Sequence, residues 1–344
     1  MAASTSLADS SLAVMGSAFK TRSGSEAPPQ LGSSEIDATK ETLMTDDRRT
    51  QTRDDESARD LSRRDFVALS VAAGLATATN TSAQTMPVAE KAVEIKTPDG
   101  TAEAMFIHPT TGTHSGVLVW PDAFGLRPAM RDIGARIAAE GYAVLVPNPF
   151  YRSAKATVNA PLFDASFDFG NQNDMAKLKQ VMGSIQASGA AERDGAAYIA
   201  FLDAQSQVNK ARKVGTQGYC MGGALVVRTA ASLPDRVGAG ASFHGGELVT
   251  DAPDSPHRLA PKIKARMYFG IAANDDSRQP DAKDDLKKAF SAANVPAEIE
   301  VYPGALHGWC VPDMPPQNGK PVYNKPDAEK AWAKLVALYK AALA

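Results

Sequence analysis

Hydrophobic and polar positions change their spacing repeatedly along the chain from about residue 90 onward. Residues 92–109, AVEIKTPDGTAEAMFIHP, surround a Pro-Asp-Gly turn and predict a β-hairpin. Continuous apolar runs, GVLVW at 116–120 and YAVLVP at 142–147, are typical of strands buried on both faces. Between them, the apolar residues of AMRDIGARIAAEGY, residues 129–142, recur at helical spacing. Strands therefore alternate with helices in this part of the chain.

The same alternation continues to the end of the sequence. Further strands are predicted at 213–219, 237–245, 265–272 and 297–304, and further helices at 174–186, 191–208, 223–233, 280–294 and 325–343. Alternation of this kind predicts a mostly parallel sheet with helices on both faces. No internal repeat is visible, so we expect residues 84–344 to form a single α/β domain.

The N-terminal part differs in composition. Residues 1–61 are rich in Ser, Thr, Ala, Asp and Arg and hold one aromatic residue, Phe19. Such a segment buries too little apolar surface to offset its ordering entropy, so it is predicted to be a disordered extension.

Residues 62–83, SRRDFVALSVAAGLATATNTSA, have the pattern of an export signal. A twin arginine, Arg63-Arg64, precedes a modest apolar run, and small residues follow at Thr81 and Ala83. The run is shorter than the about 20 residues that a spanning helix needs. The segment resembles a twin-arginine (Tat) signal, and the alternative is a short helix at the end of a disordered tail.

This resemblance implies a destination. The chain is expected to pass through the Tat translocon of a bacterium and to work in the periplasm or outside the cell. The mature protein would begin near Gln84 without a membrane span, and Met44 is an alternative start of translation.

Composition narrows the classes of function. The formal net charge is −2, which does not favour nucleic acid or an anionic membrane as a partner. There are two cysteines and five histidines, with no C-x-x-C and no H-x-x-x-H spacing. A metal site therefore fits poorly, and the chemistry below needs no cofactor.

The stretch GTQGYCMGG, residues 215–223, places Cys220 between a predicted strand and a predicted helix. G-x-C-x-G has the form of a nucleophile elbow with Cys in place of Ser, in which flanking glycines permit a sharp turn. The helix N-terminus behind it favours thiolate over thiol. A buried structural cysteine is the alternative.

Two more segments place chemical groups after predicted strands. In FGIAANDDSRQP, Asp275 and Asp276 follow one strand, although Asp is also common in turns. In YPGALHGW, His307 follows the next strand. Cys220, acid and His307 then occur in the chain order of α/β-hydrolase triads. His244, at the end of another strand, is expected to be structural or to contact substrate.

The chain resembles the dienelactone hydrolase family, α/β-hydrolases with a cysteine nucleophile, over about residues 95–343. The motifs that carry the resemblance are WPDAFGLRPAMRDIGARIAAEGYAVLVPNPFYR, GYCMGG, NDDSRQP and VYPGALHGW. The resemblance implies Cys220 as the nucleophile, His307 as the base and Asp275 as the acid, with Asp276 as the fallback. It implies a small-molecule ester or lactone as substrate.

The resemblance also assigns binding groups. The N–H groups of Met221 and Ala123 would form the oxyanion hole. Arg152, in NPFYR, resembles an arginine that pairs with the substrate carboxylate, a task suited to a guanidinium. Asp122 stands where the family has a Glu that contacts the resting cysteine. The family's second arginine, a few residues beyond the histidine, is absent from HGWCVPD.

Other interpretations stay open at this point. Cys310 follows His307 by three residues, and export would permit a disulfide between Cys220 and Cys310 that silences the enzyme. A broad esterase or thioesterase for small acyl substrates is the alternative activity. A catalytically silent exported binding protein is the alternative class, because a fold does not fix a function.

Overall fold

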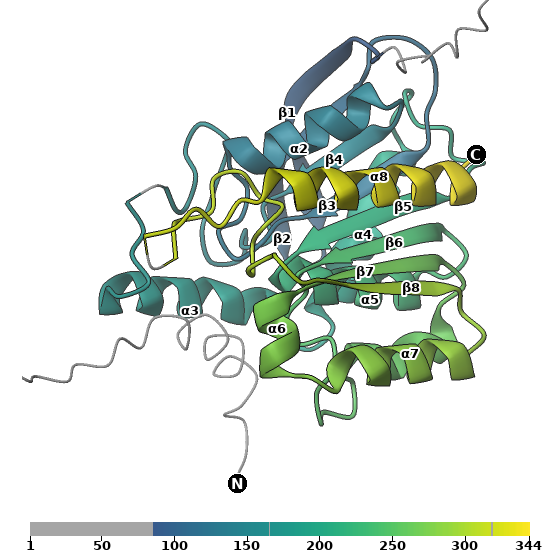
Figure 1. Ribbon diagram of the computed structural model, residues 1–344. Helices are drawn as coiled ribbons and strands as arrows, with labels where there is room; N and C mark the ends of the chain where they lie inside the picture. The colour runs from purple at the N-terminus through teal and green to yellow at the C-terminus, as the bar shows by residue number, and fades with distance from the viewer. Residues whose placement is uncertain (1–84, 165, 318) are drawn as a thin grey trace, which may run out of the picture. The chain divides into compact units, whose positions relative to one another are not determined.

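An eight-stranded sheet forms the centre of the part of the chain that the computed structural model describes, residues 85–344 without 165 and 318 (Figure 1). Its strands are β1 (Val88–Thr97), β2 (Gly100–Pro109), β3 (Gly116–Trp120), β4 (Ala143–Pro147), β5 (Val214–Tyr219), β6 (Val237–Phe243), β7 (Arg266–Ala272) and β8 (Ala297–Tyr302). The predicted disordered extension and the Tat-like signal lie outside the described residues.

The strand order is β1-β2-β4-β3-β5-β6-β7-β8. The hairpin of β1 and β2 is antiparallel and joins β4 antiparallel, whereas every later pairing is parallel. The predicted mostly parallel sheet is confirmed. All carboxyl ends of the parallel strands therefore meet at one edge, where ligands bind in open α/β sheets.

Helices cover both faces of this sheet. They are α2 (Pro128–Ala139), α3 (Gln172–Gln186), α4 (Ala190–Asp203), α5 (Met221–Ser232), α6 (Ala273–Arg278), α7 (Ala282–Ala292), α8 (Lys325–Ala342) and a 3-10 helix, η2 (Pro256–Lys262). One apolar cluster packs α2 and α8 on one face, and another packs α3, α4, α5 and α7 on the opposite face. This is the α/β-hydrolase arrangement.

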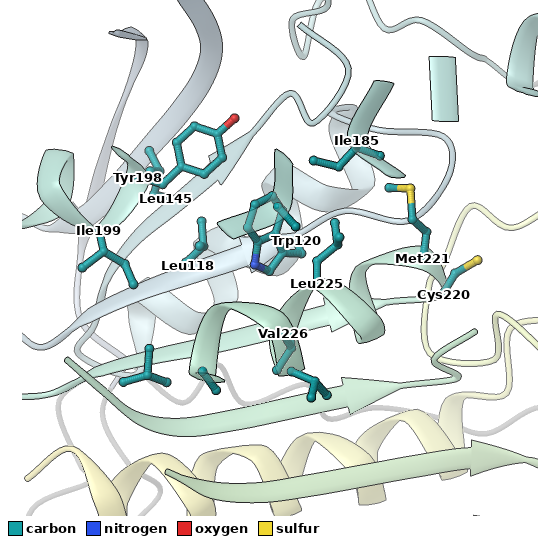
Figure 2. Close-up of a cluster of buried hydrophobic side chains, with 14 of the residues drawn as sticks. Leu118, Trp120, Leu145, Ile185, Tyr198, Ile199, Cys220, Met221, Leu225 and Val226 are labelled. Carbon is teal, nitrogen blue, oxygen red and sulfur yellow. The ribbon is translucent and has the colours of Figure 1, made fainter. Parts of the chain in front are cut away.

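The larger cluster, part of which is drawn in Figure 2, and the cluster on the opposite face together explain why β3 and β4 are apolar throughout. β3 and β4 are buried at every position, because each contributes side chains to both clusters. Trp120 is fully buried and donates from Nε1 to Thr229 Oγ1 of α5 (3.1 Å). Cys220 and Met221 lie at one end of this cluster, so the core itself positions the start of α5.

The element boundaries differ from the sequence prediction at two places that have a physical cause. Helix α4 ends at Asp203 instead of residue 208, because Gln207 and Asn209 pair with the backbone of His114 (2.9 and 2.8 Å). Residues 273–278, for which the sequence predicted no helix and a turn was the alternative to a catalytic acid, form the short helix α6, whose first turn carries Asp275 and Asp276. Carboxylates are favourable at that end of a helix.

Candidate active site

Cys220 occupies the turn between β5 and α5 in a strained backbone conformation. Its φ is 52° and its ψ is −118°, a region that residues other than glycine rarely adopt. Its N–H donates to the carbonyl of Phe243 (3.0 Å), and its carbonyl accepts from the N–H of Gly246 (3.1 Å). Neighbouring strands thus hold a conformation that costs about 1–3 kcal/mol, as happens at functional sites.

The glycines around Cys220 are required by close backbone contacts. A Cβ on Gly218 would lie 2.1 Å from the carbonyl oxygen of Gly222. A Cβ on Gly222 would lie 2.5 Å from the carbonyl oxygen of Trp120. The G-x-C-x-G spacing therefore reflects the packing of the elbow against β3 and not only the freedom of the turn.

His307 and Asp275 are joined by a hydrogen bond. Nδ1 of His307 lies 2.8 Å from Oδ2 of Asp275, and both side chains are largely buried. Asp276 points to a different partner, since its Oδ1 accepts from Nζ of Lys283 (2.8 Å). The geometry brings Asp275, and not the fallback Asp276, to the histidine.

Helix α6 fixes the loop that carries His307. The side-chain oxygen of Asn274 accepts from the N–H of His307 (2.8 Å), and the N–H of Ala273 donates to the carbonyl of Ala305 (3.0 Å). Three successive residues of α6, 273–275, therefore hold the backbone and the ring of His307 together. The contact between Asp275 and His307 agrees with the order expected from sequence, which gave no sign of the support from Asn274.

The other ring nitrogen of His307, Nε2, is buried, and His307 lines the same cavity as Cys220. Burial alone would lower the pKa of His307, but the charges of Asp275 and of a Cys220 thiolate outweigh burial and raise this pKa well above its ordinary value. These surroundings therefore stabilise a positive charge on the ring of His307.

His244 lies behind this pair and does not line the cavity. It is fully buried at a φ of 39°, and its Nδ1 accepts from the N–H of Cys220 (3.1 Å). Its ring centre is 4.8 Å from that of His307, edge to face. Burial and the charge of His307 lower the pKa of His244 well below its usual value, so it stays neutral there. The structure thus gives it the structural role that was one of the two expectations.

The cavity next to Cys220 has a volume of about 120 Å³ and lies on the α5 face of the sheet. Its walls include Ile185 of α3 and Met221 and Leu225 of α5, which Figure 2 shows near Cys220. Arg228, further along α5, also lines it. Sequence reasoning missed Arg228, although Met221, Leu225 and Arg228 recur at the spacing of one helix face.

Arg152 is not among the residues that line this cavity. Its guanidinium donates to both carboxylate oxygens of Asp194 (2.8 and 2.6 Å) and to Asp99 (2.6 and 3.1 Å), and it stacks over Tyr151. Asp194 is fully buried, so Arg152 neutralises a carboxylate in the interior of the protein. The structure does not bring Arg152 to Cys220 as the substrate-binding arginine that was expected.

Asp122 is also engaged by a buried ion pair. Both of its carboxylate oxygens accept from Arg127 (2.7 and 2.9 Å), and Oδ1 also accepts from the N–H of Phe124 (2.9 Å). Arg127 in turn donates to Asp313 (2.8 Å), on the segment that follows His307. Asp122 therefore orders the loop after β3 and does not line the cavity as a substrate-binding group.

The two predicted oxyanion donors come from adjoining segments. Met221 is the first residue of α5, where N–H groups have no carbonyl partner inside the helix. Ala123 is fully buried in the loop that Asp122 and Arg127 hold. Because Gly222 contacts the backbone of β3, the start of α5 and the loop after β3 are in direct contact.

Cys310 belongs to a second cavity, of about 390 Å³, between α2 and α8. Tyr219 and Phe243, the residues before Cys220 and His244, line it. Both cysteines are free, and they pack with the two different apolar clusters. Burial raises the pKa of Cys310 well above its usual value. This arrangement gives no support to a Cys220–Cys310 disulfide.

The part of the chain that the structure describes lacks two features. Within residues 85–344, as described, no group of three or more His, Cys, Asp or Glu side chains could hold a metal ion. Within the same part of the chain, no helix is both long and apolar enough to cross a bilayer.

Comparison with known proteins gives one family. Residues 102–343 match the family model described as "Dienelactone hydrolase family". A Synechocystis protein named "Putative carboxymethylenebutenolidase" is 29% identical over 235 residues, which cover 67% of this chain and 88% of that protein. A Methylorubrum extorquens protein of the same name is 27% identical over 291 residues, 80% of this chain and 91% of that protein.

A solved structure agrees in fold. The crystal structure of a dienelactone hydrolase-like promiscuous phosphotriesterase from metagenomic libraries superposes with a TM-score of 0.61 at 21% identity, covering 75% of this chain and 99% of that one. At this identity the likeness concerns the fold alone. The family model spans nearly the whole described sheet and its helices, from β2 to α8. The chain therefore belongs to the dienelactone hydrolase family.

Proposed function

We propose that this hydrolase cleaves ester or lactone bonds in small substrates with Cys220 as nucleophile, His307 as base and Asp275 as the acid that orients it. The observation that carries the proposal is the hydrogen bond between His307 and Asp275 beside a strained Cys220 in one cavity. The carboxymethylenebutenolidase names of the relatives agree with a lactone or ester substrate.

Attack on the substrate begins with a proton transfer. With Nδ1–H of His307 donating to Asp275, Nε2 is the acceptor of the neutral ring and takes the proton of the Cys220 thiol. The negative charge of Asp275, which raises the pKa of His307, stabilises the resulting imidazolium. Met221 begins α5 next to Cys220, so the positive end of the helix dipole favours the thiolate as well.

The thiolate then adds to the substrate carbonyl. The carbonyl oxygen becomes an oxyanion, which the N–H groups of Met221 and Ala123 stabilise; one such donor is worth about 10²–10³ in rate. The C–O bond breaks, the leaving alcohol takes the proton from His307, and a thioester on Cys220 remains. His307 next removes a proton from water, whose oxygen attacks the thioester and releases the acid and the thiol.

A broad carboxylesterase or thioesterase is the second candidate, and one observation favours it. Arg152, the group expected to select a carboxylated lactone, is engaged by Asp99 and Asp194. Without that arginine at the cavity, selection for a carboxylate on the substrate has no support from the residues that the resemblance pointed to. Both candidates use the same three catalytic side chains.

The test compares the two cysteines in the full chain. Wild type, Cys220→Ala and Cys310→Ala are assayed with p-nitrophenyl acetate and with a carboxylated enol lactone. We expect Cys220→Ala to lose at least about 10³-fold in kcat/KM, and Cys310→Ala to stay within about twofold. Rapid acid quenching followed by mass spectrometry should show the acyl group on Cys220.

Two results would overturn the proposal. Equal activity of wild type and Cys220→Ala would exclude Cys220 as nucleophile. No turnover of either substrate, together with a Cys220 that resists iodoacetamide after reduction, would identify the protein as a silent binder.

A further inference from the structure

We propose that the cavity beside Cys220 accepts an uncharged acyl chain of medium length lying along α5, and that the cluster of Arg228, Glu192 and Asp254 at its distal part excludes a chain that ends in a carboxylate. The proposal rests on the proposed function and names the substrate class of that same site. It differs from the carboxylated lactone that the family resemblance implied.

One face of α5 forms a wall of the cavity from Cys220 outward. Met221, Ala224, Leu225 and Arg228 all line it, at the three- and four-residue spacing that puts helical side chains on one stripe. Eight residues separate Cys220 from Arg228, which corresponds to about 12 Å along the helix axis. The cavity is therefore elongated and not confined to the reacting group.

Between Cys220 and Arg228 the cavity has apolar walls, and its volume is small. Met182 and Ile185 of α3 and Leu225 of α5 are almost fully buried and line it. A volume of about 120 Å³ is well below the roughly 300–1,000 Å³ typical of drug-sized ligands. A single unbranched chain matches a long cavity of small volume better than a ring with several substituents.

The distal part carries an ion cluster with excess negative charge. Nη1 of Arg228 donates to Glu192 of α4 (3.2 Å), and Nη2 donates to the carboxylate of Asp254 (3.1 Å) and to its backbone carbonyl (3.1 Å). All three residues line the cavity. One guanidinium thus faces two carboxylates.

This charge balance decides which chain end fits. A carboxylate that reached Arg228 would have to compete with Glu192, which is partly buried, and with Asp254, which is exposed, and would be repelled by both. A methyl end meets no such penalty and keeps the benefit of burying each methylene along α5. Arg228 is therefore held by its neighbours and does not act as a free carboxylate-binding arginine.

The first arm of the test is chain length, measured on the full chain. We expect kcat/KM to rise from p-nitrophenyl acetate through hexanoate to octanoate, by up to about fourfold for each methylene buried. Ala224→Met places a larger side chain in the α5 wall and should reduce the octanoate-to-acetate ratio at least about tenfold. Ala333→Met, at an exposed position of α8, is the matched control and should leave the ratio unchanged.

The second arm is charge. p-Nitrophenyl hexanoate is compared with the p-nitrophenyl monoester of adipic acid, which has the same chain length with a terminal carboxylate. We expect wild type to prefer hexanoate by about tenfold at low salt, and less at high salt, because partly exposed charges are screened. The double variant Glu192→Gln, Asp254→Asn should lower or reverse that preference, whereas the exposed pair Asp235→Asn, Glu298→Gln should not.

The outcomes separate the α5 channel, the exclusion of carboxylates and the proposed function. Rates that do not depend on chain length, or an Ala224→Met variant that keeps the wild-type ratio, overturn the α5 channel while the proposed function stands. An adipate monoester hydrolysed as fast as hexanoate overturns the exclusion of carboxylates. Absence of any Cys220-dependent hydrolysis is a failure of the proposed function itself.

Discussion

The two cysteines lie on opposite faces of one sheet, and their surroundings differ in the features that govern a thiol. Cys220 immediately precedes α5, has a positive φ of 52°, and shares a cavity with His307. Cys310 packs between α2 and α8 in a cavity lined mostly by apolar side chains, where burial raises its pKa. One loop supplies both His307 to the first cavity and Cys310 to the second.

The reactivity of a thiol therefore depends on its position relative to a helix end and a histidine. Three residues separate His307 from Cys310 in sequence, yet they serve different cavities because the chain turns after Gly308, whose φ is 97°. Proximity of Cys310 to His307 in sequence suggested a disulfide between Cys310 and Cys220, but it does not place Cys310 in the cavity of Cys220.

The largest expected effect comes from the acid that orients His307. Asp275→Asn removes the carboxylate that accepts from Nδ1, so we expect kcat/KM for p-nitrophenyl acetate to fall by about 10²–10⁴-fold. The pKa of His307 should also fall, since the Asp275 charge is a main reason that it is raised. Steady-state kinetics and an NMR titration of the His307 ring protons measure the two changes.

Asp276→Asn is the matched control for that variant. Its carboxylate pairs with Lys283, so activity should stay within about twofold and the His307 titration should not move. A larger loss in Asp276→Asn than in Asp275→Asn would show that the acid has been assigned to the wrong residue.

The second prediction concerns the pH dependence of the two thiols. A raised pKa keeps Cys310 in the neutral thiol form at neutral pH, and its thiolate forms only as the pH rises beyond the ordinary thiol range. We expect iodoacetamide at pH 7 to alkylate Cys220 at least about tenfold faster than Cys310, with the ratio falling as the pH is raised. Peptide mass spectrometry over time gives both rates, and equal rates at pH 7 would contradict the contrast.

The smallest expected effect is on stability at the elbow. Gly222→Ala places a Cβ 2.5 Å from the Trp120 carbonyl oxygen, a backbone atom that cannot turn away, so the free energy of unfolding should fall by about 1–3 kcal/mol. Gly183→Ala on α3 meets nothing within 4 Å and should raise it by about 0.5–1 kcal/mol. Urea unfolding of both variants measures the difference, and equal midpoints would mean that the elbow tolerates a side chain.

Much of the fold followed from short-range pattern. The runs at 116–120 and 142–147 predicted β3 and β4 to within one residue, because strands buried on both faces are enriched in apolar residues. Helix α4 was predicted too long, because its end depends on pairing with His114, which lies far away in the sequence.

From sequence alone followed the alternation of strands and helices, the glycine-flanked turn at Cys220, and the chain order of Cys220, the Asp275–Asp276 pair and His307. These features depend on local spacing and on chain order, which a sequence contains directly. Spacing left Asp275 and Asp276 both possible as the acid.

The tertiary structure alone decided which groups meet. It joined Asp275 to His307, engaged Arg152 with Asp194 and Asp122 with Arg127, and brought Arg228 into the cavity of Cys220. Apart from the local pair of Asp122 and Arg127, these contacts join segments that are distant in the sequence, and the residue types alone do not reveal which partners meet.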